Sequence, residues 1–205
     1  TYKFVDRNKY CYSFDQVKQI QKGIDDLCDL RFSTNELHFL RKTGVFEEEF
    51  LNYLMTFHLS KDSVYWQQEF DQIKLYFHGN LMEASMFEIY VMAIVSEVRS
   101  QNSDMTIGEQ RLQDKIANVK DKGINFSLID FGTRRRHSYD WQYHVVQQLT
   151  EHLEGFKGTS NMLISKELGM QPVGTMAHEW FQIHQGLYPV EQSQIKALDN
   201  WIDIY

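Results

Sequence analysis

The part of this chain with the clearest chemical potential is residues 130–136, whose sequence is DFGTRRR. The segment follows a short apolar run, residues 126–129, that is typical of a buried strand. A glycine and three arginines directly after a strand place fixed positive charge at the strand's carboxyl end, where α/β proteins bind ligands. This pattern predicts an anionic ligand. A solvated basic turn is the alternative interpretation, and the segment alone leaves it open.

Two further segments predict loops of the same kind. Residues 158–161 have the sequence GTSN, residues 174–179 have the sequence GTMAHE, and each follows a short strand-like stretch. In a parallel sheet or barrel, the loops that follow successive strands converge on one face. Together the three loops offer an aromatic ring, arginines, small hydroxyl groups, glycine backbone and a histidine. That set suits a flat anionic ligand and phosphate groups, because arginine forks match carboxylate and phosphate oxygens.

His178 is the histidine best placed for chemistry, because it alone of the eight falls on a predicted strand-end loop. A histidine nitrogen can act as a general base or as a nucleophile toward a phosphoryl group, and Glu179 follows it directly. The alternative is a structural histidine that caps the next helix. A zinc site with His184 is excluded, because these histidines are six residues apart and a metal-binding helix places them four apart.

The composition excludes several classes of function. The chain has 205 residues and a formal net charge of −7, which argues against nucleic acid or an anionic membrane as the main partner. No apolar run approaches the ~20 residues that span a bilayer, and the first residues do not resemble a signal peptide. Cys11 and Cys28 lack metal-ligand spacing, so we interpret them as free thiols in a reducing cytoplasm and leave a disulfide open.

The first part of the chain is expected to be a mixed domain of strands and helices. Alternating residues predict strands at residues 2–7 and 64–77, the second region with a turn near Asp71. Helical spacing and caps predict helices at residues 15–30, from Ser33 or Thr34 to Gly44, and at 46–58, 82–98 and 107–119. The fourth of these is apolar almost all round, which predicts a buried helix.

After residue 123 strands and helices alternate. Short strands are expected at residues 126–129, 155–161 and 171–175, and helices at residues 141–153, up to 168–169, from 178 and at 192–205. Strand–loop–helix units in series are typical of a parallel sheet or barrel. We therefore expect an α/β fold with two domains, residues 1–123 and 124–205. A complete eight-unit barrel takes about 250 residues, so we expect the second domain to be the first part of a larger barrel.

Three segments together resemble one family. The sequences DFGTRRR at residues 130–136, GTSN at 158–161 and GTMAHEWF at 174–181 resemble bacterial nicotinate phosphoribosyltransferase in order and spacing. The stretch YVMAIVSEV at residues 90–98 is also similar to that family, and the resemblance runs through all 205 residues. It implies an α+β N-terminal domain followed by the first strand–helix units of an irregular α/β barrel, as in type II phosphoribosyltransferases.

The resemblance also implies a reaction. The family joins nicotinate to 5-phosphoribosyl 1-diphosphate (PRPP), giving nicotinate mononucleotide and pyrophosphate for NAD biosynthesis, and couples ATP hydrolysis through a phosphohistidine. By resemblance, His178 is that histidine, Phe131 stacks on the pyridine ring and Arg134 holds the ligand's anionic groups. Ser160 stands where related nicotinamide-specific enzymes carry an aspartate. An aspartate would repel a carboxylate, so Ser160 favours nicotinate over nicotinamide.

Further contacts and partners follow from the same resemblance. Thr159 and Thr175 are expected to contact the substrate, and Arg135 and Arg136 are candidate phosphate contacts. Mg²⁺ is expected to accompany PRPP and ATP, with no permanently bound cofactor and no metal site formed by the chain itself. We expect a cytoplasmic enzyme without a nucleic-acid or membrane partner.

The resemblance also predicts that the chain is shorter than the family. Family members begin earlier and continue past Tyr205 through an aspartate-rich segment and glycine loops that bind the PRPP phosphates. We therefore expect a homodimer, or a companion chain that carries the rest of the barrel. The alternative is a non-catalytic half that works only when such a chain supplies the PRPP-binding segments.

Overall fold

The computed structural model describes residues 1–6, 10–69, 72–123 and 126–205. The chain divides into two compact units, Thr1–Pro172 and Val173–Tyr205, and each has its own internal packing. Within the described ranges, no helix combines the length and the apolar character that a membrane crossing requires. The domain boundary expected near residue 124 falls outside the described ranges and stays a prediction.

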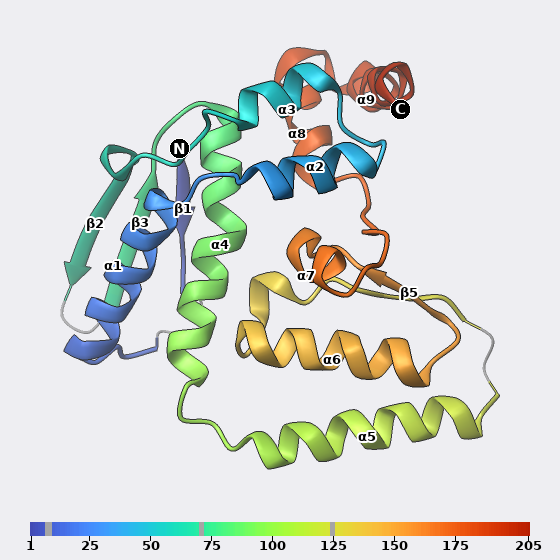
Figure 1. Ribbon diagram of the computed structural model, residues 1–205. Helices are drawn as coiled ribbons and strands as arrows, with labels where there is room; N and C mark the ends of the chain where they lie inside the picture. Colours follow the sequence, from blue (N-terminus) through green and yellow to red (C-terminus); the bar gives the residue numbers. More distant parts are fainter. Residues whose placement is uncertain (7–9, 70–71, 124–125) are drawn as a thin grey trace. The chain divides into compact units, whose positions relative to one another are not determined.

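An antiparallel sheet begins the first unit (Figure 1). Its strands lie in the order β1 (Tyr2–Phe4), β3 (Gln72–Phe77) and β2 (Val64–Glu69). Leu75 of β3 is paired with Phe4 on one side and with Trp66 on the other, and it is fully buried. Both predicted strand regions are confirmed, although β1 is shorter than expected. The turn predicted near Asp71 lies outside the described residues.

The helices of the first half are α1 (Phe14–Asp29), α2 (Thr34–Lys42), α3 (Glu48–Leu54), the short 3-10 helix η1 (Lys61–Ser63) and α4 (Leu81–Ser100). All of these except α3 begin at a side-chain cap. Ser13, Ser33 and Asn80 each form a capping box, in which the cap side chain and a side chain three residues later satisfy each other's backbone amides. The predicted helices are confirmed, and α3 is shorter than the predicted 46–58.

The first core lies between these helices and the sheet. α1 packs against α4, and α4 lies beside β1 (Figure 1). Ile20 of α1 and Phe87 of α4 are fully buried, and Phe87 stacks on Phe77 of β3 at 4.7 Å between ring centroids. The predicted burial of α4 holds for most of its apolar residues, but Ile89 and Tyr90 are exposed by 45% and 43%.

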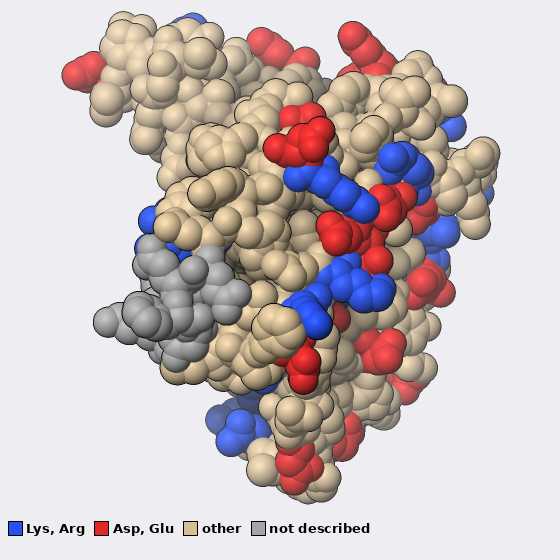
Figure 2. Space-filling view, turned by 90° about the vertical axis from the view of Figure 1, so that its left-hand side faces the viewer, with Lys and Arg blue, Asp and Glu red and all other residues tan. Residues whose placement is uncertain are grey.

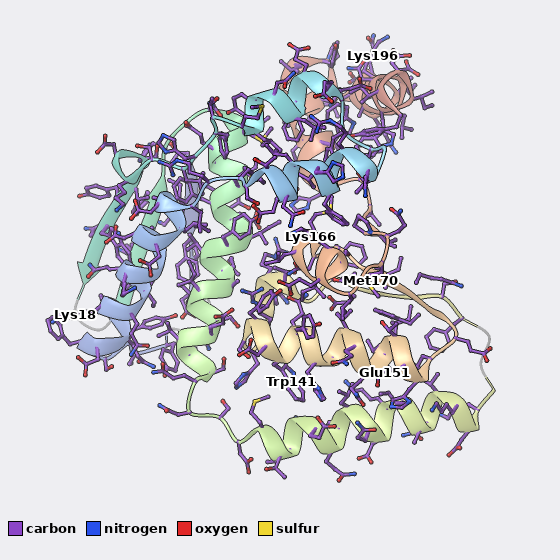
Figure 3. The ribbon with its side chains drawn as sticks, in the orientation of Figure 1. Lys18, Trp141, Glu151, Lys166, Met170 and Lys196 are labelled. Carbon is purple, nitrogen blue, oxygen red and sulfur yellow. The ribbon has the colours of Figure 1, made fainter. Side chains whose placement is uncertain are left out.

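The second half of this unit builds a parallel strand pair. Its elements are α5 (Met105–Asp121), β4 (Leu128–Asp130), the 3-10 helix η2 (Thr133–Arg135), α6 (Tyr139–His152), β5 (Phe156–Thr159) and α7 (Met162–Glu167). α5 and α6 lie side by side, with the Trp141 ring between them (Figure 3) and close to Gly108. A Cβ at Gly155 would overlap the backbone oxygen of Phe126, so only glycine lets these segments approach this closely.

The second unit contains α8 (His178–Leu187) and α9 (Val190–Ile204), which pack on each other. The indole Nε1 of Trp180 donates to the backbone oxygen of Ala197 at 2.8 Å, which joins the two helices. The strand predicted at residues 171–175 is wrong, because the segment has no regular structure. Pro172 has no N–H for a strand ladder, and a strand exists only where a neighbour accepts and donates hydrogen bonds.

Charged side chains of both signs are interspersed on the face shown in Figure 2. Exposed ion pairs of the first unit include Lys22 with Asp26 at 2.5 Å and Lys61 with Asp29 at 3.1 Å. Each exposed pair of this type contributes about 0.2–1 kcal/mol at most. Such pairs therefore add little to stability. The mixture of signs leaves no continuous basic stripe on the described part of the face in Figure 2.

Candidate functional site

Two loops lie side by side where β4 and β5 end. We call residues 130–136 the arginine loop and residues 158–161 the serine loop. The strands are parallel neighbours, with Asp130 opposite Thr159, and the amide of Ser160 donates to the backbone oxygen of Asp130 at 2.9 Å. The predicted convergence of these two loops is confirmed. The third loop, residues 174–179, belongs to the other unit, and its convergence with them stays a prediction.

The carboxylate of Asp130 organises the start of the arginine loop. One of its oxygens accepts from the amide of Gly132 at 2.9 Å, and the other accepts from Nε2 of Gln142 and from the hydroxyl of Thr159, both at 2.7 Å. A Cβ at Gly132 would lie 2.7 Å from the first oxygen, so glycine is needed there for close approach. Asp130 therefore acts as a bridge between the strand ends.

Two carboxamides extend this bridge. Gln142 is 3% exposed, and its Nε2 also donates to the hydroxyl of Thr133 at 3.0 Å. Asn161 donates from Nδ2 to the same hydroxyl at 3.1 Å and to Oε1 of Gln142 at 3.3 Å. Its own Oδ1 accepts from the amides of Leu163 and Ile164 and so caps α7. The two loops and the first turn of α7 are thus one hydrogen-bonded assembly.

The three arginines have different surroundings. Arg134 is ion-paired with Glu88 of α4, and Arg136 is paired with Glu97 of the same helix at 2.6 Å. Arg135 is exposed and makes no ion pair within the described part of the chain. The sequence left open which arginine serves the structure, and the ion pairs give two of them a structural role. The predicted ligand contacts of Arg134, Arg135 and Arg136 stay predictions. The side chain of Arg134 is 39% exposed, so part of it is accessible to a ligand.

Tyr139 joins the end of the arginine loop to α7. Its hydroxyl donates to Oε2 of Glu167 at 2.5 Å, and the guanidinium of Arg136 lies over its ring at 5.2 Å from the centroid. Burial of the phenol, together with the hydrogen bond and the negative charge of Glu167, raises the pKa of Tyr139 well above its usual range. Tyr139 therefore stays a hydrogen-bond donor at every physiological pH.

The other predicted contacts of the first unit differ in accessibility. Phe131 is 51% exposed, and within the described residues its ring has no aromatic partner. Ser160 is half-buried, and its hydroxyl makes no hydrogen bond to any residue that the structure describes. Thr159 is fully buried, and its hydroxyl is committed to Asp130. Its side chain positions the loop, and the substrate contact predicted for it stays a prediction.

His178 is the first residue of α8. Its side chain is 65% exposed, and Nε2 lies 3.2 Å from Oε1 of Glu179. The N-cap is Ala177, and no side chain caps this helix. The alternative interpretation of His178 as a structural cap is therefore wrong. Thr175 is exposed in the irregular segment before the helix. The predicted roles of His178 and Thr175 stay predictions.

The described residues offer no metal centre. They contain no group of three or more histidine, cysteine, aspartate or glutamate side chains that could hold an ion. The carboxylate of Asp130 already accepts three hydrogen bonds. Mg²⁺ is commonly held by one or two carboxylates together with substrate phosphates, so the ion expected with PRPP and ATP stays a prediction.

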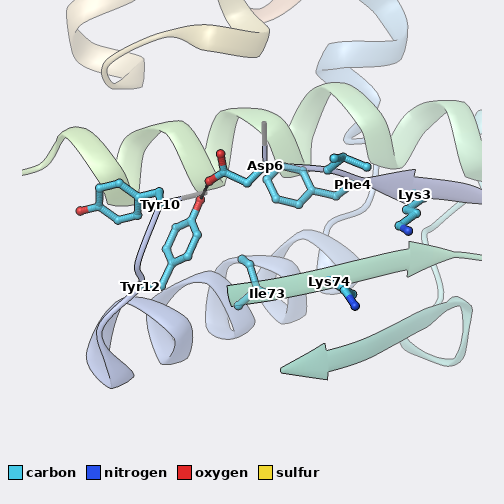
Figure 4. A pocket seen from close by; sticks show the side chains of 8 residues that line it. Lys3, Phe4, Asp6, Tyr10, Tyr12, Ile73 and Lys74 are labelled. Atoms are coloured by element: carbon cyan, nitrogen blue, oxygen red, sulfur yellow. Dashed lines mark hydrogen bonds between the residues drawn. The ribbon is translucent and has the colours of Figure 1, made fainter. Parts of the chain in front are cut away.

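A cavity of about 110 Å³ lies elsewhere, against the N-terminal sheet (Figure 4). Lys3, Tyr10 and Ile73 are among the residues that line it. Tyr12 donates to Oδ2 of Asp6 at 2.7 Å across it, and burial and this carboxylate raise the pKa of Tyr12 well above its usual range. No residue of the arginine or serine loop lines this cavity, so it is not a candidate for the ligand site.

Gln142, Glu88 and Glu97 escaped the sequence analysis, although each carries a signal. Gln142 lies on the apolar stripe of α6, four residues before Val146, which is fully buried. A polar residue on such a stripe must be hydrogen-bonded. Likewise, a carboxylate within a largely apolar helix such as α4 needs a cationic partner. Neither signal names the partner, which only the fold supplies.

Comparisons with known proteins agree in their result. A model of the nicotinate phosphoribosyltransferase N-terminal domain matches residues 1–96, and a model of the nicotinate phosphoribosyltransferase family matches residues 126–205. A nicotinate phosphoribosyltransferase of Chromobacterium violaceum is 38% identical, over 100% of this chain and 54% of the relative. One of Psychromonas ingrahamii is 36% identical, over 100% of this chain and 52% of the relative.

The fold agrees as well. The solved structure of nicotinate phosphoribosyltransferase from Vibrio cholerae matches with a TM-score of 0.87 and 31% sequence identity. The match covers 99% of this chain and 51% of that one. The predicted α/β fold is therefore confirmed, and the chain spans about half the length of the curated relatives that it matches.

Proposed function

Since this chain belongs to the nicotinate phosphoribosyltransferase family, we propose that it carries the pyridine-binding part of a site that joins nicotinate to PRPP. The reaction makes nicotinate mononucleotide and pyrophosphate for NAD biosynthesis. The ring nitrogen of nicotinate forms a bond to C1 of the ribose, and the bond from C1 to pyrophosphate breaks. The observation that carries the proposal is the exposed ring of Phe131 on the arginine loop, which has no aromatic partner among the described residues.

The arginine loop supplies the surface for the pyridine. Phe131 offers a flat apolar face, and offset stacking of two aromatic rings contributes about 0.5–1.5 kcal/mol beyond the area that is buried. Arg134 has part of its guanidinium accessible and directs it from a fixed position, because Glu88 holds it. A guanidinium forms paired hydrogen bonds with a carboxylate, which suits nicotinate. Arg135 is the further cation for phosphate groups.

Ser160 selects between the acid and the amide of the substrate. Its hydroxyl has no partner among the described residues, and a hydroxyl can donate to a carboxylate oxygen. The aspartate of nicotinamide-specific relatives would place two like charges together. We therefore expect nicotinate to be preferred over nicotinamide, and Ser160→Asp to weaken nicotinate binding.

His178 accepts the γ-phosphoryl group of ATP in this proposal. An imidazole nitrogen forms a bond to phosphorus, ADP leaves, and later hydrolysis releases phosphate. The first turn of a helix favours negative charge, and His178 is the first of the ten residues of α8. Glu179 lies within 3.2 Å of Nε2 and can orient the ring. Mg²⁺ neutralises the phosphates of PRPP and ATP when it is bound.

The partner in this proposal is a second copy of the chain or a companion chain with the PRPP-binding segments. The cytoplasmic location expected from the cysteines is part of the same proposal. The competing function is a non-catalytic half, which would bind nicotinate and turn over nothing until a companion is added.

The test combines binding with turnover. Nicotinate binding is measured by NMR titration with nicotinamide as the control ligand, and nicotinate mononucleotide is assayed with PRPP and Mg²⁺, with and without ATP. We expect nicotinate to bind and nicotinamide to bind at least about tenfold more weakly. Phe131→Ala should weaken binding, and His178→Ala should remove the stimulation by ATP. A chain that binds neither ligand refutes the proposal, and binding without turnover supports the companion-chain reading.

A further inference from the structure

A buried carboxamide on α6 holds the two loops of the site together. Gln142 is contributed by neither loop, yet it donates to Asp130 and Thr133 of the arginine loop and accepts from Asn161 of the serine loop. We propose that Gln142 is a positioning residue that couples the two loops and sets the gap between Phe131 and Ser160. The consequence for nicotinate rests on the proposed function, whereas the coupling itself does not.

The hydrogen bonds of Gln142 fix the orientation of its amide. Its NH₂ group has two donors, and these are used at 2.7 Å by Asp130 and at 3.0 Å by Thr133. Its oxygen accepts at 3.3 Å from Asn161. The flipped amide would set its oxygen against the carboxylate of Asp130 and its NH₂ against the NH₂ of Asn161. Both contacts would be repulsive, so a single orientation is stable.

Water cannot replace these contacts, because Gln142 is 3% exposed. The helix that carries it is also firmly placed. Val146, one turn further along α6, is fully buried, and Trp141 packs between α5 and α6 (Figure 3). Gln142 therefore anchors both loops to the same well-packed helix.

The two loops also meet directly at two places. Asp130 and Thr159 bond at the strand ends, where β4 and β5 already fix the backbone, and Nδ2 of Asn161 donates to the hydroxyl of Thr133 at 3.1 Å. The contacts of Gln142 reach further, to Thr133 in η2 and Asn161 in the cap of α7. These are the parts of the loops that follow Phe131 and Ser160 in the chain. Loss of the carboxamide would leave one hydrogen bond, from Asn161 to Thr133, between these parts, so we expect them to loosen while the strands stay paired.

The expected effect on the ligand follows from geometry. Phe131 and Ser160 would contact opposite parts of one rigid ring, so the affinity for the ring depends on the distance between these two residues. A displacement of about 1 Å in a binding group can cost up to about a hundredfold in function. A loosened gap is a milder change, and we expect a loss of about tenfold in nicotinate affinity.

The test uses three variants of the full chain. Gln142→Met keeps the length of the side chain and removes every hydrogen bond. Gln142→Glu keeps the shape but donates to Asp130 only when its own carboxyl is protonated. Gln147→Met is the control, because Gln147 lies on the same helix and, among the residues that the structure describes, bonds only to Glu151 of that helix. NMR follows hydrogen exchange at the amides of Gly132 and Asn161, which report on the two loops separately.

We expect Gln142→Met to speed exchange at both amides by at least about tenfold and to raise the Kd for nicotinate about tenfold. Gln147→Met should leave both within about twofold. Relative to the parent protein at the same pH, Gln142→Glu should exchange faster at pH 7 and recover toward the parent rate at pH 5. It also serves as the test if Gln142→Met does not fold.

Several results would overturn the inference. Exchange that speeds up at one amide alone, or at neither, shows that Gln142 does not couple the loops. Faster exchange at both amides with an unchanged Kd shows that the coupling does not set the ring site. If the parent protein binds no nicotinate, the proposed function and the claim about the ring fail together. The exchange measurements still decide the coupling in that case.

Discussion

Replacing Thr159 by valine tests the polar bridge beneath the site. Thr159 is fully buried at the end of β5, and its hydroxyl has two partners. It donates to Oδ2 of Asp130 at 2.7 Å and accepts from the amide of Asn161 at 3.0 Å. Valine has nearly the same shape and fits the same space, so the change removes hydrogen bonds and little else.

The cost can be worked out from these two partners. The bond to a charged carboxylate contributes about 1.5–3 kcal/mol, and Asp130 keeps two other donors, so the lower end applies. The amide of Asn161 would be left without its acceptor in a partly buried position, which costs about 1–3 kcal/mol. We therefore expect Thr159→Val to lower the free energy of unfolding by about 3 kcal/mol.

Two controls separate the bridge from general damage. Thr159→Ser keeps the hydroxyl and loses one methyl group, which should cost about 1 kcal/mol. Thr150→Val removes a hydroxyl that bonds to Val146 within α6, and it should change stability by less than about 0.5 kcal/mol. Urea unfolding is followed by circular dichroism and by tryptophan fluorescence, whose agreement tests for a single transition. A loss for Thr159→Val no larger than that for Thr159→Ser would refute the reasoning.

Two further substitutions and one labelling experiment test other parts of the chain. Gly155→Ala would overlap a backbone oxygen of the segment before β4, so we expect a loss of at least about 2 kcal/mol in urea unfolding. Ser33→Ala should cost about 1 kcal/mol at pH 7. Burial raises the pKa of Glu36, but hydrogen bonds from Ser33 outweigh this effect and lower the pKa below its value in the unfolded chain. The stability that these bonds contribute is therefore fully present above about pH 4.3, the unfolded pKa, and is lost as the pH falls through the folded pKa. Cys11 is exposed and should react quickly with a thiol reagent, whereas Cys28 is buried and its raised pKa should delay its reaction until the chain unfolds.

The sequence predicts helices and strands better than it predicts which side chains bond to each other. The loops after β4 and β5 could be placed because an apolar run followed by glycine and polar residues marks a strand end. Their closeness then follows from parallel pairing. The predicted strand at residues 171–175 failed because a strand depends on a neighbour, and Pro172 weakens any ladder. The ion pair of Arg134 with Glu88 joins residues far apart in the chain, so no local pattern reveals it.

The ion pairs of the arginine loop bear on both interpretations of its sequence, and the ligand site stays a prediction. Three cations after a strand suggested either a ligand site or a solvated turn. Two carboxylates of α4 neutralise Arg134 and Arg136, so the loop holds far less free positive charge than its sequence suggests. Glu88 and Glu97 are about two and a half turns apart along α4, so the two ion pairs fix the loop to that helix at two separate points. A neutralised and fixed arginine attracts anions weakly from a distance but binds them in one geometry. In the proposed function, Arg134 selects a planar carboxylate in this way, whereas Arg135, which makes no ion pair within the described residues, serves the phosphate groups.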